Sequence, residues 1–119
     1  MIELVLPYPP SVNHYWVHAR GRAFISKAGR KFRESVIWEC KAKRVPRQPG
    51  RLGVVIRACP PDKRRRDLDN VLKGVLDALE HAGVYRDDSQ VDDLRICRGS
   101  VLKGGALLVQ IAQLRHLEL

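Results

Sequence analysis

The sequence predicts an α+β fold: a roughly four-stranded mixed sheet with two helices packed on one face. Two segments carry apolar residues at helical spacing, and four shorter segments are rich in β-branched and apolar residues. The length of 119 residues, 45% of them hydrophobic and 29% charged, is that of one globular domain with one modest core. We therefore expect a single small domain over residues 1–119.

The first half of the chain predicts one strand and one long helix, with a loop between them. Residues 2–6 alternate partly between polar and apolar side chains, and Pro7 ends this strand. Residues 11–25 follow no regular period and carry aromatic and basic side chains, which predicts an irregular loop. Ser26 is a suitable N-cap for a helix over 27–43, whose apolar side chains recur on one helical face.

The second half predicts a buried strand, the most regular helix of the chain and two further strands. Residues 52–59 are β-branched and mostly apolar, which favours a buried strand. The helix that follows has Asp67 at its N-cap and Gly83 as a left-handed residue after its end. Strands near 92–98 and 105–112 complete the sheet, with a glycine pair in the turn between them. The core stripe of the helix consists of Leu68, Val71, Leu72, Val75, Leu76 and Leu79.

Composition and cysteine usage exclude several classes of protein. The apolar runs are far shorter than the ~20 residues that cross a bilayer, and the N-terminal segment lacks the pattern of a signal peptide. Three cysteines without a CxxC pair argue against a disulfide framework and a thiolate zinc site. His14 and His18 lie four residues apart but lack further ligands at zinc spacing. We expect a reduced cytoplasmic protein with no membrane contact and no organic cofactor.

Charge is distributed unevenly along the chain. The net charge is +9, yet residues 41–66 hold ten basic side chains and one acidic one, whereas residues 67–93 hold eight acidic side chains and two basic ones. A basic excess favours binding of a polyanion such as a nucleic acid. The acidic segment would repel that polyanion unless a divalent cation lay between them. The alternative is that these acids are solvated helix and turn charges.

The first candidate site lies where the basic segment meets the acidic one. Asp67 as N-cap and Asp69 in the first helical turn have a structural explanation, because carboxylates there accept from free N–H groups and favour the helix dipole. Asp69 and Lys73 share a helix face at i, i+4, and an ion pair between them would explain that spacing. The cations that precede the first aspartate suit phosphate contacts, or else form a solvated loop. They are Lys63, Arg64, Arg65 and Arg66.

A second acidic cluster, Asp87-Asp88, follows the helix in a segment whose composition is typical of a turn. Asp88 gains a chemical role only if the fold brings it next to Asp67 and Asp69. The helix between them spans ~15 residues, or roughly 22 Å. The strand near residue 92 would therefore have to run back toward the helix N-terminus, or the loop would have to fold beneath it. A shared chemical role requires these three carboxylates to converge, and the sequence leaves this open.

The segment 11–25 offers further contacts to a nucleic acid, because it combines aromatic, amide and basic side chains. A ring in the loop Asn13–Trp16 could lie against an unstacked base. The alternative is that Tyr15 and Trp16 pack over the sheet. The candidates in this segment are Asn13, Tyr15, Trp16 and Arg22.

Several motifs occur together along most of the chain. They are Leu6–Ser11 with Asn13, Gly21-Arg22, Arg64–Asn70 with Lys73 and Asp77–Leu79, Asp87-Asp88 with Gln90-Val91, and Lys103–Gly105. Each motif alone is weak, but as an ensemble they resemble the RusA-type Holliday junction resolvase family. Arg86 stands where relatives carry an apolar or aromatic residue, and Tyr8 where tryptophan is usual. Neither departure removes a catalytic group.

The resemblance implies a small homodimeric endonuclease, bacterial or phage-encoded, that acts in DNA recombination and repair. Such an enzyme resolves four-way DNA junctions by paired symmetric nicks and uses Mg2+ or Mn2+. The resemblance also implies that Asp67, Asp69 and Asp88 bind the metal and that Lys73 is the essential catalytic lysine. Carboxylates are the ligands that Mg2+ prefers, and the bound metal activates water and holds phosphate oxygens. Lys73 would stabilise the developing charge or orient the attacking water.

Two alternatives to a junction resolvase stay open at this point. The first is a non-catalytic basic nucleic-acid-binding module, in which the acids serve only as helix caps and turn residues. The second is a nuclease that acts on flaps, forks or RNA with the same active-site chemistry.

Overall fold

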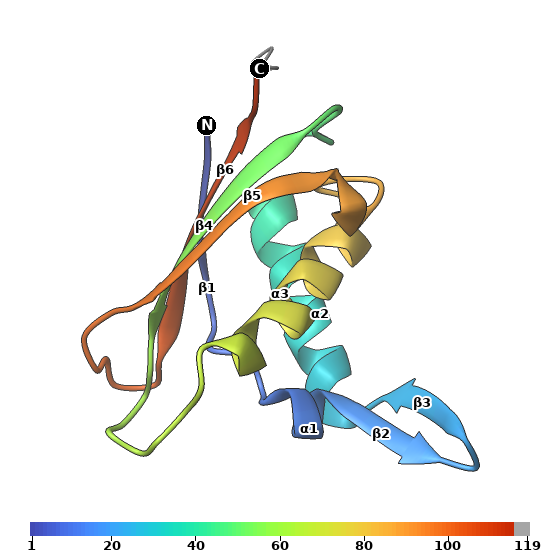
Figure 1. Cartoon of the computed structure of the whole chain (residues 1–119), viewed down its shortest axis with the longest axis vertical. Coiled ribbons are helices and arrows are strands. Elements are labelled where there is room, and N and C mark those ends of the chain that lie inside the picture. The colour runs from blue at the N-terminus through green and yellow to red at the C-terminus, as the bar shows by residue number, and fades with distance from the viewer. Residues whose placement is uncertain (116–119) are drawn as a thin grey trace.

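A computed structural model describes residues 1–115; residues 116–119, which the expected domain includes, lie outside the described part. Two long helices, α2 (Lys27–Ala42) and α3 (Asp69–His81), lie on one face of the main sheet (Figure 1). The predicted α+β class, with its four-stranded sheet and its helix layer, is confirmed. None of the helices within residues 1–115 is long and apolar enough to cross a membrane. The strands of the main sheet are β1 (Ile2–Leu6), β4 (Leu52–Cys59), β5 (Val91–Arg98) and β6 (Ala106–Gln113).

The sheet is mixed, and one of its pairings decides where the candidate site residues lie. Its order is β1-β6-β4-β5; β6 pairs antiparallel with β1 and with β4, while β4 and β5 are parallel. Parallel neighbours need a crossover connection, and α3 supplies it. The strand β5 therefore starts at the C-terminal end of α3 and runs toward its N-terminal end. The glycine pair Gly104-Gly105 does join β5 to β6, but these strands do not pair, because β4 lies between them.

The core lies between the main sheet and the two long helices. Side chains of β4 alternate between buried and more exposed positions, as expected of a central strand with helices on one side. Burial of each large aliphatic side chain contributes about 1.5–3 kcal/mol, so these contacts hold α3 firmly on the sheet. Burial also raises the pKa of the Cys40 thiol to about 11, so this cysteine is an inert core group. The buried helix residues include Phe32, Val36, Val71, Val75, Ala78 and Leu79.

The expectation of an irregular loop over 11–25 is wrong. The short helix α1 (Val12–Tyr15) is followed by a two-stranded hairpin of β2 (Trp16–Ala19) and β3 (Arg22–Ile25), which extends beyond the main sheet (Figure 1). Both residues of its turn, Arg20 and Gly21, have positive φ angles of 54° and 72°. A two-residue hairpin turn of this kind usually contains Asn-Gly or Asp-Gly, and an arginine in the first position hides that signal.

The helix ends confirm two of the three predicted caps. The Ser26 hydroxyl accepts a hydrogen bond from the Gly29 amide at 2.9 Å, as an N-cap should. Gly83 has a φ of 80° and donates to the Glu80 carbonyl, which closes α3 in a left-handed turn. Asp67 is not a side-chain cap, because α3 starts at Asp69 and the residue before it already has helical angles. The Asp67 carboxylate therefore does not serve as the helix N-cap that the sequence predicts.

Candidate nucleic-acid interface and cation site

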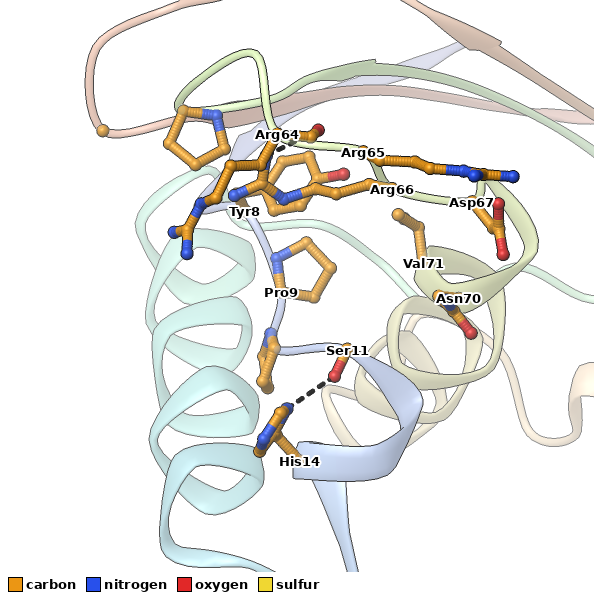
Figure 2. Close-up of a pocket in the computed structure, with 13 residues that line it drawn as sticks. Tyr8, Pro9, Ser11, His14, Arg64, Arg65, Arg66, Asp67, Asn70 and Val71 are labelled. Carbon is orange, nitrogen blue, oxygen red and sulfur yellow. Dashed lines mark hydrogen bonds between the residues drawn. The ribbon is translucent and has the colours of Figure 1, made fainter.

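The basic loop, which we define as residues 60–68 between β4 and α3, borders a hollow of about 680 Å³ (Figure 2). The hollow is also lined by residues 8–11 and His14, which precede the hairpin, and by the first turn of α3. Arginine side chains and proline rings therefore share one concave surface. Such a surface suits the sugar–phosphate backbone of a nucleic acid, because phosphates accept from the guanidinium groups.

Asp62 orders two of the four predicted phosphate-binding cations. Its carboxylate accepts a hydrogen bond from Arg66 at 2.5 Å and forms an ion pair with Arg64 at 3.2 Å. The hydrogen bonds from Arg66 and Arg64 hold the pKa of Asp62 well below its usual range. Arg66 also lies over the Tyr8 ring, 5.9 Å from its centroid. Within residues 1–115 no ion pair engages Lys63 or Arg65, so these two cations are available to a ligand.

Three of the four predicted catalytic residues lie at or near the N-terminal end of α3. Asp67 and Asp69 are exposed, and Figure 2 shows Asp67 and Asn70 at the same edge of the hollow. The ion pair between Asp69 and Lys73 that their spacing allows is not formed among the described residues. The Lys73 ammonium instead lies 5.7 Å from the centroid of the Trp16 ring.

Asp88 lies at the opposite end of α3, so the three carboxylates, whose convergence the sequence left open, do not come together within one chain. The backbone amide of Asp88 donates to the Glu80 carboxylate at 2.9 Å, which places Asp88 beside the last turns of the helix. Residues 69 and 80 are separated by roughly 16 Å of helix. The strand β5 does run back toward the basic loop, but Asp88 precedes that strand. Its far end, Arg98, is what reaches the loop, donating to the Arg66 carbonyl at 2.6 Å.

At that end of α3 three acids form a cluster, defined as Glu80, Asp87 and Asp88. One carboxylate oxygen from each lies within 4.8 Å of the others. Partial burial, together with the charges of Glu80 and Asp87, raises the pKa of Asp88 above its ordinary value. A divalent cation would relieve this repulsion, and an all-oxygen donor set suits Mg2+ or Mn2+. This cluster therefore suits a divalent metal ion, and it shares Asp88 with the ligand set of Asp67, Asp69 and Asp88 that the resemblance implies.

Asp87 has a structural role that Asp88 lacks. It caps the short 3-10 helix η1 (Asp88–Gln90) by accepting from the Ser89 amide at 2.8 Å, while the Gln90 side chain accepts from the Asp87 amide. The structural alternative from the sequence, that this acidic segment forms a turn, therefore accounts for Asp87. Sequence reasoning missed Glu80 as part of the cluster. The available signal was spacing, since Glu80 shares a helix face with Asp69 and Lys73 at i+11 and i+7.

The predicted aromatic contacts need one correction. The Tyr15 side chain is 0% exposed, so no ring face is left for a base, and the alternative of packing is the correct one. Its hydroxyl donates to Asp77 at 2.6 Å, and burial raises the pKa of Tyr15 far above its ordinary value. Trp16 is half-buried beside it, with ring centroids 5.2 Å apart. Asn13 and Arg22 are exposed on α1 and on the hairpin, where a ligand could reach them.

A polar network that sequence reasoning did not foresee joins the helices α1, α2 and α3. Asp77 on α3 accepts two hydrogen bonds from the Arg33 guanidinium of α2, at 2.7 and 3.1 Å, besides the one from Tyr15 of α1. Arg33 in turn lies over the Trp16 ring, 5.7 Å from its centroid. The network fixes the start of the hairpin against α3, one turn beyond Lys73.

Fold and site together define a class of protein: a basic α+β domain with a cationic concave surface for a polyanion and exposed carboxylates suited to a hard metal ion. Residues 7–111 match the family model described as "Endodeoxyribonuclease RusA". The chain belongs to this family. It is 44% identical over 119 residues to the crossover junction endodeoxyribonuclease rusA of Enterobacteria phage HK97, and the match covers 94% of both chains.

Two further relatives, one bacterial and one from a phage, are also named crossover junction endodeoxyribonuclease. The chain is 38% identical over 118 residues to the crossover junction endodeoxyribonuclease RusA of Escherichia coli strain K12, again with 94% of each chain covered. The relative from Enterobacteria phage 82, which carries the same name, is 40% identical over 115 residues. The resemblance inferred from the motifs is confirmed, and the relatives come from both phages and bacteria, as expected.

Proposed function

We propose that this protein is a metal-dependent, structure-selective endodeoxyribonuclease that resolves Holliday junctions by paired symmetric nicks in DNA recombination and repair. The observation that carries the proposal is the match to relatives named crossover junction endodeoxyribonuclease over 94% of the chain. The basic loop beside exposed carboxylates supports it, because phosphodiester hydrolysis needs both a phosphate-binding surface and a metal site. A non-catalytic DNA-binding module would need only the first.

Mg2+ or Mn2+ would be held by Asp67, Asp69 and Asp88, and when bound it lowers the pKa of a water molecule and holds phosphate oxygens. Lys63 and Arg65 bind the flanking phosphates, since no ion pair within residues 1–115 occupies them. Lys73 carries a positive charge on the same helix face as Asp69 and stabilises the charge that develops on the phosphate. Arg66, ordered by Asp62, positions the strand that enters the site.

The position of Asp88 in one chain bears directly on the proposed homodimer. Asp69 and Glu80 lie near opposite ends of α3 but share one helix face, with Asp88 bound at the Glu80 end. A two-fold axis that crosses the middle of this face would bring the N-terminal end of one α3 next to the C-terminal end of the other. Each of two equivalent sites then takes Asp67 and Asp69 from one copy and Asp88 from its partner. Two such sites match the two equivalent strands of a junction.

The experiment that tests the activity is incubation of the purified protein with a synthetic four-way junction, a duplex, a flap and a fork. Each substrate is tested with Mg2+, with Mn2+ and with EDTA. We expect paired symmetric nicks in the junction only, with either metal and not with EDTA. Binding without cleavage of any substrate would support the non-catalytic module, and faster cleavage of flaps or forks would support a different nuclease.

We predict that Asp67→Asn and Asp69→Asn each abolish junction cleavage, because each removes a negative charge and a metal ligand. Junction binding should persist or tighten, since a carboxylate that repels the phosphates is lost. Cleavage gels and gel-shift titrations on the same junction measure the two effects. Asp93→Asn, which alters an acid paired with Arg95 on β5, is the matched control and should cleave normally. Normal cleavage by both site variants would contradict the assignment.

A further inference from the structure

Trp16 occupies an unusual position, because its ring is contacted by two cations. The Lys73 ammonium and the Arg33 guanidinium carbon each lie 5.7 Å from the centroid of the ring. Cations at this distance are attracted by the negative face of the indole, and tryptophan attracts them more strongly than the other aromatic residues do. The ring therefore contacts the lysine that the proposed function places in catalysis.

The indole N–H of Trp16 argues that packing alone does not explain this residue. The nitrogen is buried and has no hydrogen-bond partner within residues 1–115. A buried donor without a partner destabilises the fold, and a phenylalanine would fill much of the same space without that cost. The property that tryptophan adds over phenylalanine is its stronger attraction for cations.

Asp77 is the residue that could draw Lys73 away from the ring. It lies four residues after Lys73 on α3, the spacing at which lysine and aspartate form an ion pair. The Asp77 carboxylate, however, already accepts two hydrogen bonds from Arg33 and one from Tyr15. Among the described residues Lys73 consequently forms no ion pair.

We propose that Trp16 is a positioning residue: its ring holds the Lys73 ammonium, while Arg33 and Tyr15 occupy the Asp77 carboxylate. The ammonium of Lys73 therefore forms no ion pair with Asp77 and stays available to a substrate phosphate. A lysine bound to a carboxylate would have to break an ion pair before it could contact DNA. A lysine bound to a ring loses only a weak contact, and it starts from a narrow range of positions. This inference rests on the proposed role of Lys73 in cleavage.

The test compares Trp16→Leu, which keeps apolar bulk but removes the aromatic face, with Trp16→Phe, which keeps a ring. For junction cleavage we expect Trp16→Leu to lower kcat about tenfold while KM changes less than about twofold. Trp16→Phe keeps a ring that attracts cations less strongly, so its kcat should lie between those of Trp16→Leu and the wild type. The matched control is Trp38→Leu, because Trp38 is the second tryptophan of the chain and is 72% exposed on α2. It should cleave at the wild-type rate.

A readout independent of activity is the NMR spectrum of the lysine side chains. The methylene protons of Lys73 next to the ammonium should resonate upfield because of the Trp16 ring, and Trp16→Leu should move them to the position of an exposed lysine. A merely structural role of Trp16 would lower the folded fraction, which circular dichroism measures, without a selective effect on these resonances or on kcat per folded molecule.

Lys73→Ala separates failure of the inference from failure of the proposed function. If Lys73→Ala abolishes cleavage while Trp16→Leu keeps kcat within twofold of wild type, the inference is overturned and the proposed function stands. If Lys73→Ala cleaves normally, the proposed role of Lys73 falls, and the positioning role of Trp16 falls with it. Unshifted Lys73 resonances in the wild-type protein would overturn the inference whatever the rates are.

Discussion

Asp88 differs from an ordinary surface acid because other carboxylates surround it. Its pKa is raised by partial burial and by Glu80 and Asp87, whose oxygens lie within 4.8 Å of its own. For an acid with a raised folded-state pKa, ionisation favours the unfolded chain. The resulting destabilisation is absent below its unfolded value of about 3.9 and grows as the pH rises through the folded-state pKa.

At the residue scale we therefore predict that Asp88→Asn stabilises the metal-free protein at pH 7. The unfolding temperature should rise by roughly 1–3 °C, and the gain should vanish below about pH 3, where the carboxyl is protonated in both states. Addition of Mg2+ should raise the unfolding temperature of the wild type more than that of the variant, because Asp88 is a proposed ligand. Thermal melts over this pH range, with and without Mg2+, measure both effects.

Glu34→Gln, at an exposed acid of α2 outside the cluster, is the control and should show neither effect. A variant at position 88 that is less stable than the wild type at pH 7 without metal would contradict the repulsion on which this prediction is based.

At the scale of the element, α3 depends on a close approach that only glycine permits. A Cβ atom added at Gly74 would lie 2.9 Å from Cδ2 and 3.0 Å from Cε2 of the Tyr15 ring. That ring is fixed by its hydrogen bond to Asp77 and by its contact with the Phe32 ring, so it has little freedom to move away. The packing of the Tyr15 ring against Gly74 of α3 in turn sets the start of the hairpin and the place of Trp16.

We predict that Gly74→Ala destabilises the fold although alanine is the better helix former. Overpacking typically costs about 1–3 kcal/mol, which exceeds the gain of about 1 kcal/mol in helix propensity. Urea denaturation measures the change in the free energy of unfolding. In a Tyr15→Leu background the same substitution should cost less, because the clashing ring atoms are gone. Equal costs in both backgrounds would show that the Tyr15 ring is not the cause.

At the scale of the whole molecule, the fold keeps Asp88 far from Asp67 and Asp69, although the proposed metal site requires all three carboxylates. The parallel pairing of β4 with β5 makes α3 a crossover, and a crossover helix keeps the segments at its two ends apart by its own length. A cation site built from Asp67, Asp69 and Asp88 therefore needs a second copy of the chain.

This arrangement predicts complementation between two inactive variants. When Asp67→Asn and Asp88→Asn proteins are mixed and allowed to exchange subunits, about half of the dimers are mixed, and one of the two sites in each has all its native acids. We expect nicking on one strand of the junction to return, without the paired cut on the second. Strand-specific labels on the junction separate the two events.

The same experiment tests the dimer itself. If each chain built its site alone, every site of the mixed dimer would lack one ligand and no nicking would return. Sedimentation of the wild-type protein at micromolar concentration gives the control, and a strict monomer with full cleavage activity would also contradict the arrangement.

Much of the fold follows from local patterns in the sequence. The strand over 52–59 was predicted with the observed bounds, and the helix that starts after Ser26 was predicted to within one residue of its end. Both are determined by side-chain periodicity and by capping groups within a few residues. The hairpin over 16–25 was missed, because its strands have four residues each and its turn lacks the usual asparagine or aspartate.

The candidate site likewise has features that the sequence predicts and features that only the structure shows. The family, the basic loop and the acids were predictable, because motif residues and charge are properties of the chain at fixed positions. Only the folded chain shows that Asp88 lies with Glu80 and not with Asp69, that Tyr15 is a core residue, and that Lys73 contacts Trp16. Each of these depends on the order and direction of strands far apart along the chain. No local period carries that information, since it arises only when distant elements bury their apolar faces together.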